Sequence, residues 1–591
     1  MRRIAFIFLL ACSVALGAQT RTPPKRPAPR PAPRPVPSAA QSLPPGSFAA
    51  IQAVNAGHIR ADVKFLASDL LEGRGTGTRG GQLAAEYIAA QFAIAGLQPA
   101  ADNGTYFQQV PMVGITTQPQ STFQVISSSG EAKGLRMMDD YVAIDETRQE
   151  QSDLDSELVF VGYGITAPEY GWDDYANVDV RGKVLLMLVN EPLSELPPAL
   201  VSSAAGSPTL GGAATQPELK HRFTGRPLTY YGRWTYKYEH AARLGAAGVI
   251  LIHKDDLATY GWNVVRNSWT GERSYLRDDP PKLKLAAWLQ FDAARQMVFA
   301  AGQDLGTLLA AANQTGFKPV PLSVRVKVHV VSKVRFFDTP NVLGLIRGSD
   351  PELKSQAVLF TAHYDHLGIH PEQPGDNIYD GALDNASGTA MVMDIARAIA
   401  ASPVKPSRSL LFACVTAEEQ GLWGSVYLAN HLPLPASGLQ LAINFDAVAP
   451  LGLPKEASAP GYERTTFASV FDKTAAEFGM RVIPDVRPES GSYYRSDQFS
   501  FARIGVPAFS LNAGLKFEGH PESWIKQRSA EITRNYHQPG DKFNPDDDYR
   551  SNAVISRFAI ALAYKAADMP QILRWVPGDE FEKLRRLSTG Q

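Results

Sequence analysis

Four short apolar runs with the composition of β-strands alternate with helix-like segments in the C-terminal half of the chain. The runs are AVLFTA (357–362), LLFACVTA (410–417), LQLAINFDA (439–447) and VPAFSLN (506–512), and helix-like segments lie at 388–401 and 467–479. Strands that are apolar throughout must be buried on both faces, so helices must cover both sides of the sheet. The pattern predicts an α/β fold with a mostly parallel-centred mixed sheet flanked by helices.

Two further runs precede these strands. Residues 324–337 alternate apolar and charged side chains, which is typical of an edge strand or a half-exposed strand, and residues 339–348 are predicted to form its neighbour. The segment from about 158 to 312 contains separate short strand-like runs at 156–165, 182–189 and 245–256. We interpret this segment as an inserted domain with a small sheet and one or two helices.

Metal-binding residue types collect where the predicted strands end, the edge at which ligands bind in parallel sheets. His363 and Asp365 follow the first strand, and Asp384 precedes a helix. Adjacent Glu418 and Glu419 follow the second strand. Two residues complete the set, one after the third strand and one in a turn-rich segment: Asp446 and His537.

This set of side chains suits a pair of divalent metal ions. Two imidazoles and three carboxylates from this set, without a thiolate, fit a borderline metal better than a soft one. Two ions sharing one carboxylate would each keep an imidazole and a carboxylate of their own. Because the side chains of adjacent Glu418 and Glu419 diverge, we expect Glu419 to bind metal and Glu418 to act as general base on the water between the ions.

Five motifs then resemble those of the family-28 metallopeptidases, a family of dizinc aminopeptidases. They are HYDHLG (363–368), GALDNASGTA (381–390), TAEEQGLWGS (416–425), NFD (444–446) and YHQPGD (536–541). The resemblance covers residues of about 55–110 and 336–565, and it implies an α/β/α sandwich that holds two Zn²⁺ ions, with Co or Mn as substitutes. The insert resembles a protease-associated (PA) domain.

Carried over position by position, the resemblance implies a role for each residue of the set. His363 and Asp446 bind one zinc, Glu419 and His537 bind the other, Asp384 bridges them, Glu418 is the acid/base, and Asp365 orients the ligand His363 without binding zinc itself. Tyr536 matches a tyrosine that polarises the scissile carbonyl in some members, and the alternative is a packing role. Gln498 departs from the family, because it stands where a histidine is common.

The N-terminus carries the pattern of an export signal. Two arginines, an apolar stretch at 4–16 and small residues at 15, 17 and 18 predict a signal peptide at 1–18 and a secreted or periplasmic protein. The alternative is a lipoprotein anchored through Cys12. Residues 19–46 are rich in proline and predict an extended linker. The apolar stretch is too short to span a bilayer, so we expect no transmembrane span.

The sequence also suggests how the chain is divided into segments and which partners it has. We expect residues 47–154 to form the N-terminal part of the peptidase domain, 155–315 the PA insert, 316–575 the catalytic domain and 576–591 a C-terminal tail. The chain has 58 Lys and Arg against 59 Asp and Glu, so it has no net positive charge that would attract nucleic acid. We therefore expect no nucleic-acid partner. The oligomeric state is left open.

Several other features have structural interpretations. Gly75, Gly77 and Gly80 fit a G-x-G-x-x-G pattern, but a helix precedes them, so we expect a turn between helices. Cys414 lies in an apolar strand and is expected to pack in the core. We interpret three histidines outside the ligand set as surface residues: His366, His370 and His520.

The resulting functional prediction is an exported dizinc aminopeptidase. Its substrates are peptides with a free N-terminus, and Glu418 activates the attacking water. The alternatives are a carboxypeptidase or dipeptidase of the same dizinc class, and a non-catalytic, receptor-like binding module. A receptor-like protein should have lost metal ligands, whereas all five ligand-type residues stand in this chain.

Overall fold

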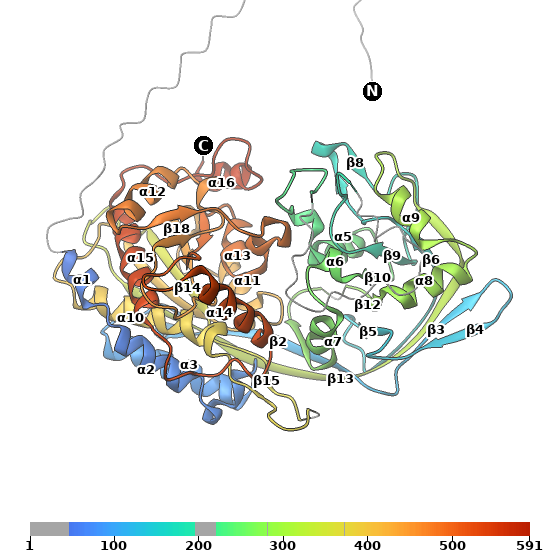
Figure 1. Cartoon of the computed structure of the whole chain (residues 1–591), viewed down its shortest axis with the longest axis horizontal. Helices are drawn as coiled ribbons and strands as arrows, with labels where there is room; N and C mark the ends of the chain where they lie inside the picture. Colours follow the sequence, from blue (N-terminus) through green and yellow to red (C-terminus); the bar gives the residue numbers. More distant parts are fainter. Residues whose placement is uncertain (1–46, 196–219, 281, 372, 591) are drawn as a thin grey trace, which may run out of the picture. The chain divides into compact units, whose positions relative to one another are not determined.

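The computed structural model describes residues 47–195, 220–280, 282–371 and 373–590 (Figure 1). The predicted signal peptide, Cys12 and the proline-rich linker lie outside these residues. Within these ranges, no helix is both long enough and apolar enough to cross a bilayer.

The four predicted apolar strands lie side by side in one sheet. β21 (Ala508–Ser510), β18 (Leu439–Asn444), β14 (Ala357–His363) and β17 (Ser409–Val415) are adjacent in that order and run parallel. β13 (Val320–Ile346) continues the sheet beyond β17 in the antiparallel direction. The predicted α/β fold, with a mixed sheet that is parallel at its centre, is therefore confirmed.

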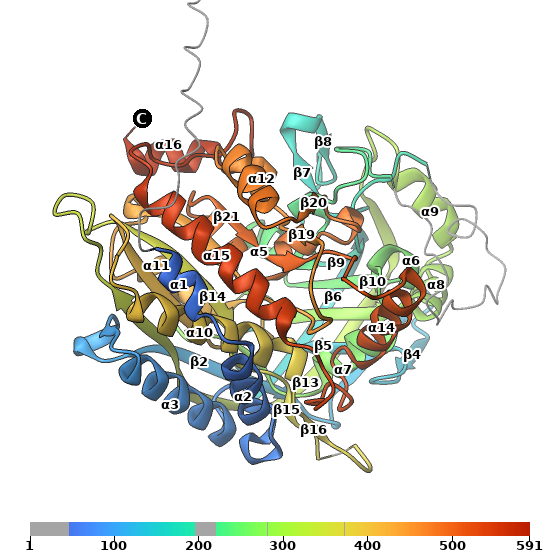
Figure 2. The ribbon, with the colours of Figure 1, turned by 60° about the vertical axis from the view of Figure 1, so that its left-hand side comes forward.

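Helices cover both faces of this sheet, as strands that are buried throughout require. Alternate residues of β14 and β17 face opposite sides: Phe360 and Phe412 belong to one apolar cluster, and Leu359 and Leu411 belong to another. The first cluster includes side chains of three long helices: α3 (Arg79–Ile94), α10 (Ser387–Ala401) and α15 (Arg550–Asp568) (Figure 2). The second includes side chains of α11 (Trp423–Asn430) and α13 (Gln498–Ala502).

The predicted pair of strands at 324–337 and 339–348 was wrong, because β13 is one strand of 27 residues. Its antiparallel register with β2 (Phe107–Thr117) runs without interruption from Ser332 to Val342 and passes through Pro340. The pairing with β2 on one side holds the backbone extended across Pro340. β13 thereby connects two groups of strands.

Most strands of the second group come from the segment predicted as an insert. β6 (Gln151–Phe160), β9 (Val184–Leu188), β10 (Gly248–His253) and β12 (Leu285–Gln290) run parallel in that order, and β5 (Tyr141–Ile144) closes the row in the antiparallel direction. The row ends at β13, with which β6 pairs. The described part of the segment contains five α-helices, so the expectation of one or two was wrong: α5 (Trp234–Arg243), α6 (Asp255–Ala258), α7 (Trp262–Thr270), α8 (Phe291–Ala300) and α9 (Leu305–Ala312).

The N-terminal glycines form a turn, as the sequence indicated. A 3₁₀ segment, Asp69–Arg74, precedes them and α3 follows, so no strand leads into the G-x-G-x-x-G pattern. Gly80 packs so closely on Leu71 that an added Cβ would lie 1.8 Å from the Leu71 carbonyl oxygen. The pattern therefore serves close backbone packing.

Candidate metal and catalytic site

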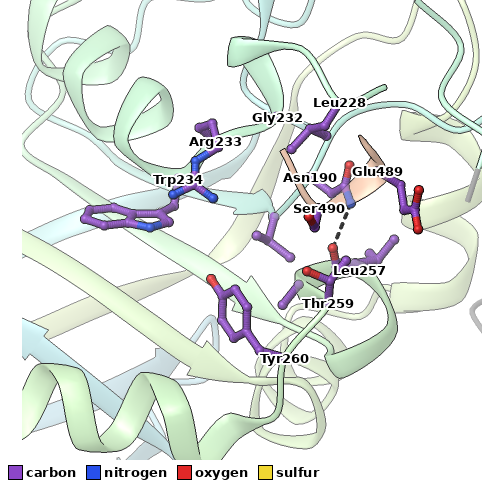
Figure 3. Close-up of a pocket in the computed structure, with 12 residues that line it drawn as sticks. Asn190, Leu228, Gly232, Arg233, Trp234, Leu257, Thr259, Tyr260, Glu489 and Ser490 are labelled. Carbon is purple, nitrogen blue, oxygen red and sulfur yellow. Dashed lines mark hydrogen bonds between the residues drawn. The ribbon is translucent and has the colours of Figure 1, made fainter. Parts of the chain in front are cut away.

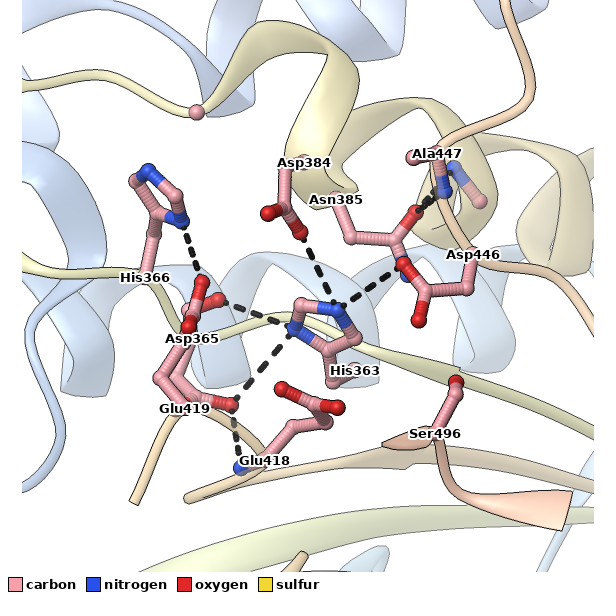
Figure 4. Close-up of polar contacts among 12 residues, drawn as sticks. His363, Asp365, His366, Asp384, Asn385, Glu418, Glu419, Asp446, Ala447 and Ser496 are labelled. Atoms are coloured by element: carbon pink, nitrogen blue, oxygen red, sulfur yellow. Dashed lines mark hydrogen bonds and ion pairs between the residues drawn. The ribbon is translucent and has the colours of Figure 1, made fainter. Parts of the chain in front are cut away.

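The first group of ligand atoms surrounds His363, the last residue of β14 (Figure 4). Its Nε2 atom lies 3.3 Å from Asp384 Oδ1 and 3.4 Å from Asp446 Oδ1. Asp446 follows β18, the strand beside β14, so two neighbouring strand ends bring these residues together. One ligand atom from each of the three residues lies within 4.8 Å of the other two, a spacing that could hold a metal ion.

The second group lies on the other side of Asp384. His537 Nε2 is 3.2 Å from Asp384 Oδ2 and 3.1 Å from Glu419 Oε2. His366 Nδ1 lies 2.7 Å from Glu419 Oε1. The two oxygens of the Asp384 carboxylate therefore face two different imidazoles, His363 and His537. The structure brings together all five residues that the sequence selected as ligands.

The prediction that His366 lies on the surface was wrong. Its side chain is fully buried, and its backbone N–H donates to the Arg74 carbonyl at 3.1 Å. Its Nε2 atom has no hydrogen-bond partner among the described residues. The motif HYDHLG contained the residue, but only the return of the N-terminal segment over this loop buries it.

Histidines and carboxylates control one another's charge in this cluster. Burial alone would lower the pKa of His363, but Glu418, Asp384 and Asp446 raise it well above its usual value. Burial opposes ionisation of Glu419 as well, yet His537 and His366 lower its pKa to about 2. The positive charge that two adjacent glutamates require is therefore supplied by imidazoles from distant parts of the chain.

Glu418 differs from its neighbour. Its backbone N–H donates to Asp365 Oδ1 at 3.1 Å, which fixes the start of the loop. Burial raises the pKa of the Glu418 carboxyl well above its usual value, and the negative charges of Asp446, Glu419 and Asp497 add to the effect against the opposing charge of His363. In the described part of the chain no lysine, arginine or histidine forms an ion pair with this carboxylate, and such a group can take up a proton.

Asp365 lies behind His363. The Nδ1 atom of His363 is 3.2 Å from the Asp365 backbone carbonyl and 3.9 Å from its carboxylate. The carboxylate accepts hydrogen bonds from Thr76 and from the Glu418 backbone. In this structure the backbone of Asp365 is the nearer partner of the ring, and its carboxylate ties the two strand-end loops together.

Two residues that the sequence reasoning missed hold the Asp384 loop. The Asp541 carboxylate accepts from the backbone N–H groups of Leu383 at 2.9 Å and Asp384 at 3.0 Å. The buried Arg74 guanidinium donates to the carbonyls of Tyr364 and Gly381, at 2.7 and 2.9 Å. Asp541 belongs to the motif YHQPGD, so its place beside His537 was a usable signal, whereas Arg74 carried none.

Tyr536 and Gln498 occupy different surroundings. The Tyr536 side chain is 41% exposed, and its ring stacks on His537 with centroids 4.0 Å apart. Gln498 is buried, accepts from Asn444 Nδ2 at 3.1 Å and donates to the Tyr493 carbonyl at 2.7 Å. Gln498 thus has protein partners for both ends of its amide.

The site residues lie within a region that matches a known family. Residues 341–562 match the model described as Peptidase family M28. Leupeptin-inactivating enzyme 1 of Streptomyces exfoliatus is 29% identical over 217 residues, which cover 35% of this chain and 46% of that protein. Leucine aminopeptidase 2 of Trichophyton rubrum is 27% identical over 298 residues, covering 47% and 52%. The chain spans about half the length of these curated relatives.

A solved structure supports the fold. An aminopeptidase from Aneurinibacillus sp. strain AM-1 superposes with a TM-score of 0.50 at 18% sequence identity, covering 90% of this chain and 98% of that one. This similarity confirms the α/β architecture. It extends over most of the chain, beyond the region matched by the family model.

Proposed function

We propose that this chain is a zinc-dependent aminopeptidase that holds two Zn²⁺ ions and hydrolyses the N-terminal peptide bond of its substrates. The observation that carries the proposal is the position of Asp384 between His363 and His537, with one carboxylate oxygen toward each ring. The match to peptidase family M28 and the zinc metalloproteases and leucine aminopeptidases among the relatives support it.

The residues fit two ions. His363 and Asp446 would hold one zinc, His537 and Glu419 the other, and Asp384 would touch both. The ligand chemistry supports zinc, because imidazole and carboxylate are its usual ligands when no thiolate is present. Both histidines have pKa values raised well above normal by the facing carboxylates, which outweigh the effect of burial, so this cluster attracts positive charge strongly. Cobalt or manganese are the expected substitutes.

The bound zinc pair would supply a water of lowered pKa and a Lewis acid for the scissile carbonyl. Glu418 would take the proton of that water and then give it to the leaving amine. Its raised pKa and its lack of an ion-pair partner among the described residues support this role, because a proton carrier must hold the proton between the two steps. Asp365 would fix both His363 and the Glu418 loop.

Other parts of the proposal concern positions around this centre. Tyr536, partly exposed beside His537, would donate to the oxyanion that forms from the carbonyl. Residues 155–315 would form a PA insert. The protein would be exported by a signal peptide at 1–18, with a lipid anchor through Cys12 as the alternative.

The Glu418→Gln variant tests the proposal. We expect it to keep the zinc content of the wild type and to lose about 10²- to 10⁴-fold in kcat on leucine 4-nitroanilide, because only the proton carrier is removed. Glu419→Gln is the matched control next to it, and it should lose zinc as well as activity. A Glu418→Gln enzyme with wild-type kcat would refute the proposed role of Glu418.

A further inference from the structure

Two arginines beside the site have no carboxylate partner. Arg233 is the N-cap residue of α5, and Arg495 ends the 3₁₀ turn Ser492–Arg495. In the described part of the chain neither guanidinium forms an ion pair within 4.0 Å, and the buried Nε atom of Arg233 has no hydrogen-bond partner. An arginine at a helix N-terminus also faces the positive end of the helix dipole, which makes its position unfavourable.

Tyr260 brings the two arginines together. The Arg495 guanidinium lies over the Tyr260 ring, 5.8 Å from its centroid. Arg233 lines the same pocket as Tyr260, where the segment 155–315 meets Glu489 and Ser490 (Figure 3). Burial raises the pKa of the Tyr260 hydroxyl, and the charges of both arginines oppose that effect. Tyr260 is therefore within electrostatic reach of both guanidinium groups.

The pair lies next to the candidate catalytic site. Ser496, the residue after Arg495, accepts from Asn444 Nδ2 at 2.8 Å and lies beside the ligand residues (Figure 4). Burial alone would lower the pKa of Arg495, but Tyr536, Tyr260 and Glu418 raise it above its usual value. Arg495 is therefore within electrostatic reach of the groups that we propose to act on the substrate.

Other arginines of the same junction are paired. Arg226 lies 3.1 Å from the Glu489 carboxylate, and Arg503 lies 3.6 Å from Glu239. By contrast, burial and then the charge of Arg495 lower the pKa of Arg233 to about 10. Arg233 thus lies near a second cation and has no carboxylate within ion-pair distance among the described residues, and an anion from outside the chain would stabilise this arrangement.

We propose that Arg233 and Arg495 bind a carboxylate group of the peptide substrate. This inference rests on the proposed peptidase function and gives the segment 155–315 a direct part in substrate choice, because Arg233 comes from that segment. Arginine suits the role since its planar fork of N–H donors matches a carboxylate. The carboxylate is either the C-terminus of a short peptide or an acidic side chain.

Two pairs of substrates separate these sources. Comparing the KM of Leu-Ala with that of Leu-Ala-amide tests recognition of the C-terminal carboxylate. Comparing Leu-Glu-amide with Leu-Gln-amide tests recognition of an acidic side chain. We expect the wild type to have a KM about 10- to 100-fold lower for the charged member of one pair, as the loss of charge-assisted hydrogen bonds implies. In Arg233→Gln and Arg495→Gln that ratio should approach 1.

Arg226→Gln is the matched control, because it removes a paired arginine from the same junction, and it should keep the wild-type ratio. Since each ratio is internal to one preparation, partial loss of folded protein changes both members equally. Arg233→Lys should retain part of the preference, because the charge remains while the fork is lost. Equal KM values within both pairs in the wild type, or unchanged ratios in both glutamine variants, would overturn the inference. If none of the four substrates is hydrolysed, the result would instead contradict the proposed function.

Discussion

Asp541 offers a sensitive test of how the chain positions the proposed shared ligand. Its two carboxylate oxygens accept the backbone N–H groups of Leu383 and Asp384, at 2.9 and 3.0 Å. Asp541→Asn keeps the shape of the side chain and one acceptor oxygen, but it turns an NH₂ group toward the other N–H. The variant therefore loses one hydrogen bond to a charged group, which is worth about 1.5–3 kcal/mol.

Asp541 contacts the loop of Asp384 and no group that we propose to bind substrate. We therefore expect the lost hydrogen bond to lower the affinity for zinc. At 1.4 kcal/mol per tenfold change, zinc should bind about 10- to 100-fold more weakly. Competition against a chromophoric chelator measures the affinity directly. Activity followed against free zinc should shift by the same factor and reach a similar maximum.

Asp376→Asn is the control, because Asp376 is a half-exposed carboxylate that pairs with Lys542, the residue after Asp541. It should leave zinc affinity unchanged within about twofold, as expected for a surface ion pair. Wild-type zinc affinity in a folded Asp541→Asn protein would show that the Asp384 loop is held by other contacts and would refute this reasoning.

Two further predictions concern the Glu418–Glu419 loop and the core. Arg273, in β11 (Arg273–Leu276), donates to the carbonyls of Glu419 at 3.2 Å and Gln420 at 3.0 Å. The Arg273→Gln variant should therefore lower kcat about 10-fold or more, because the loop would be displaced. An unchanged kcat would contradict this role. Phe412→Ala should lower the free energy of unfolding by about 3–5 kcal/mol in urea denaturation, because the buried Phe412 ring packs on two other rings. Phe299 is 79% exposed, so Phe299→Ala should change the free energy of unfolding by less than about 0.5 kcal/mol. Equal losses in the two variants would contradict the assigned core.

The sequence predicted the centre of the site because of one property of parallel sheets. Strands that run parallel end at the same edge, so His363 and Asp446, which are far apart in the chain, become neighbours once β14 and β18 pair. Asp384 and His537 lie outside the strands, and the sequence selected them because Asp384 precedes a helix and His537 lies in a turn-rich segment. The structure places both beside that edge.

The sequence could not predict features that depend on contacts between distant segments. His366 is buried because the turn after Arg74 returns over its loop, some 290 residues away in the chain, and no local pattern signals that return. The length of β13 depends on its pairing with β2, which holds the backbone extended through Pro340. The pairing state of Arg233 and Arg495 likewise depends on how the segment 155–315 meets the catalytic part of the chain.

The central claim is that Asp384 is shared by two zinc ions. Its most direct test is the zinc content of the full protein after equilibration with excess zinc and removal of the unbound metal, measured in parallel for the wild type and Asp384→Ala. We predict two zinc ions per chain in the wild type and fewer than one in the variant. At most one ion in the wild type, or two ions in Asp384→Ala, would contradict the shared site.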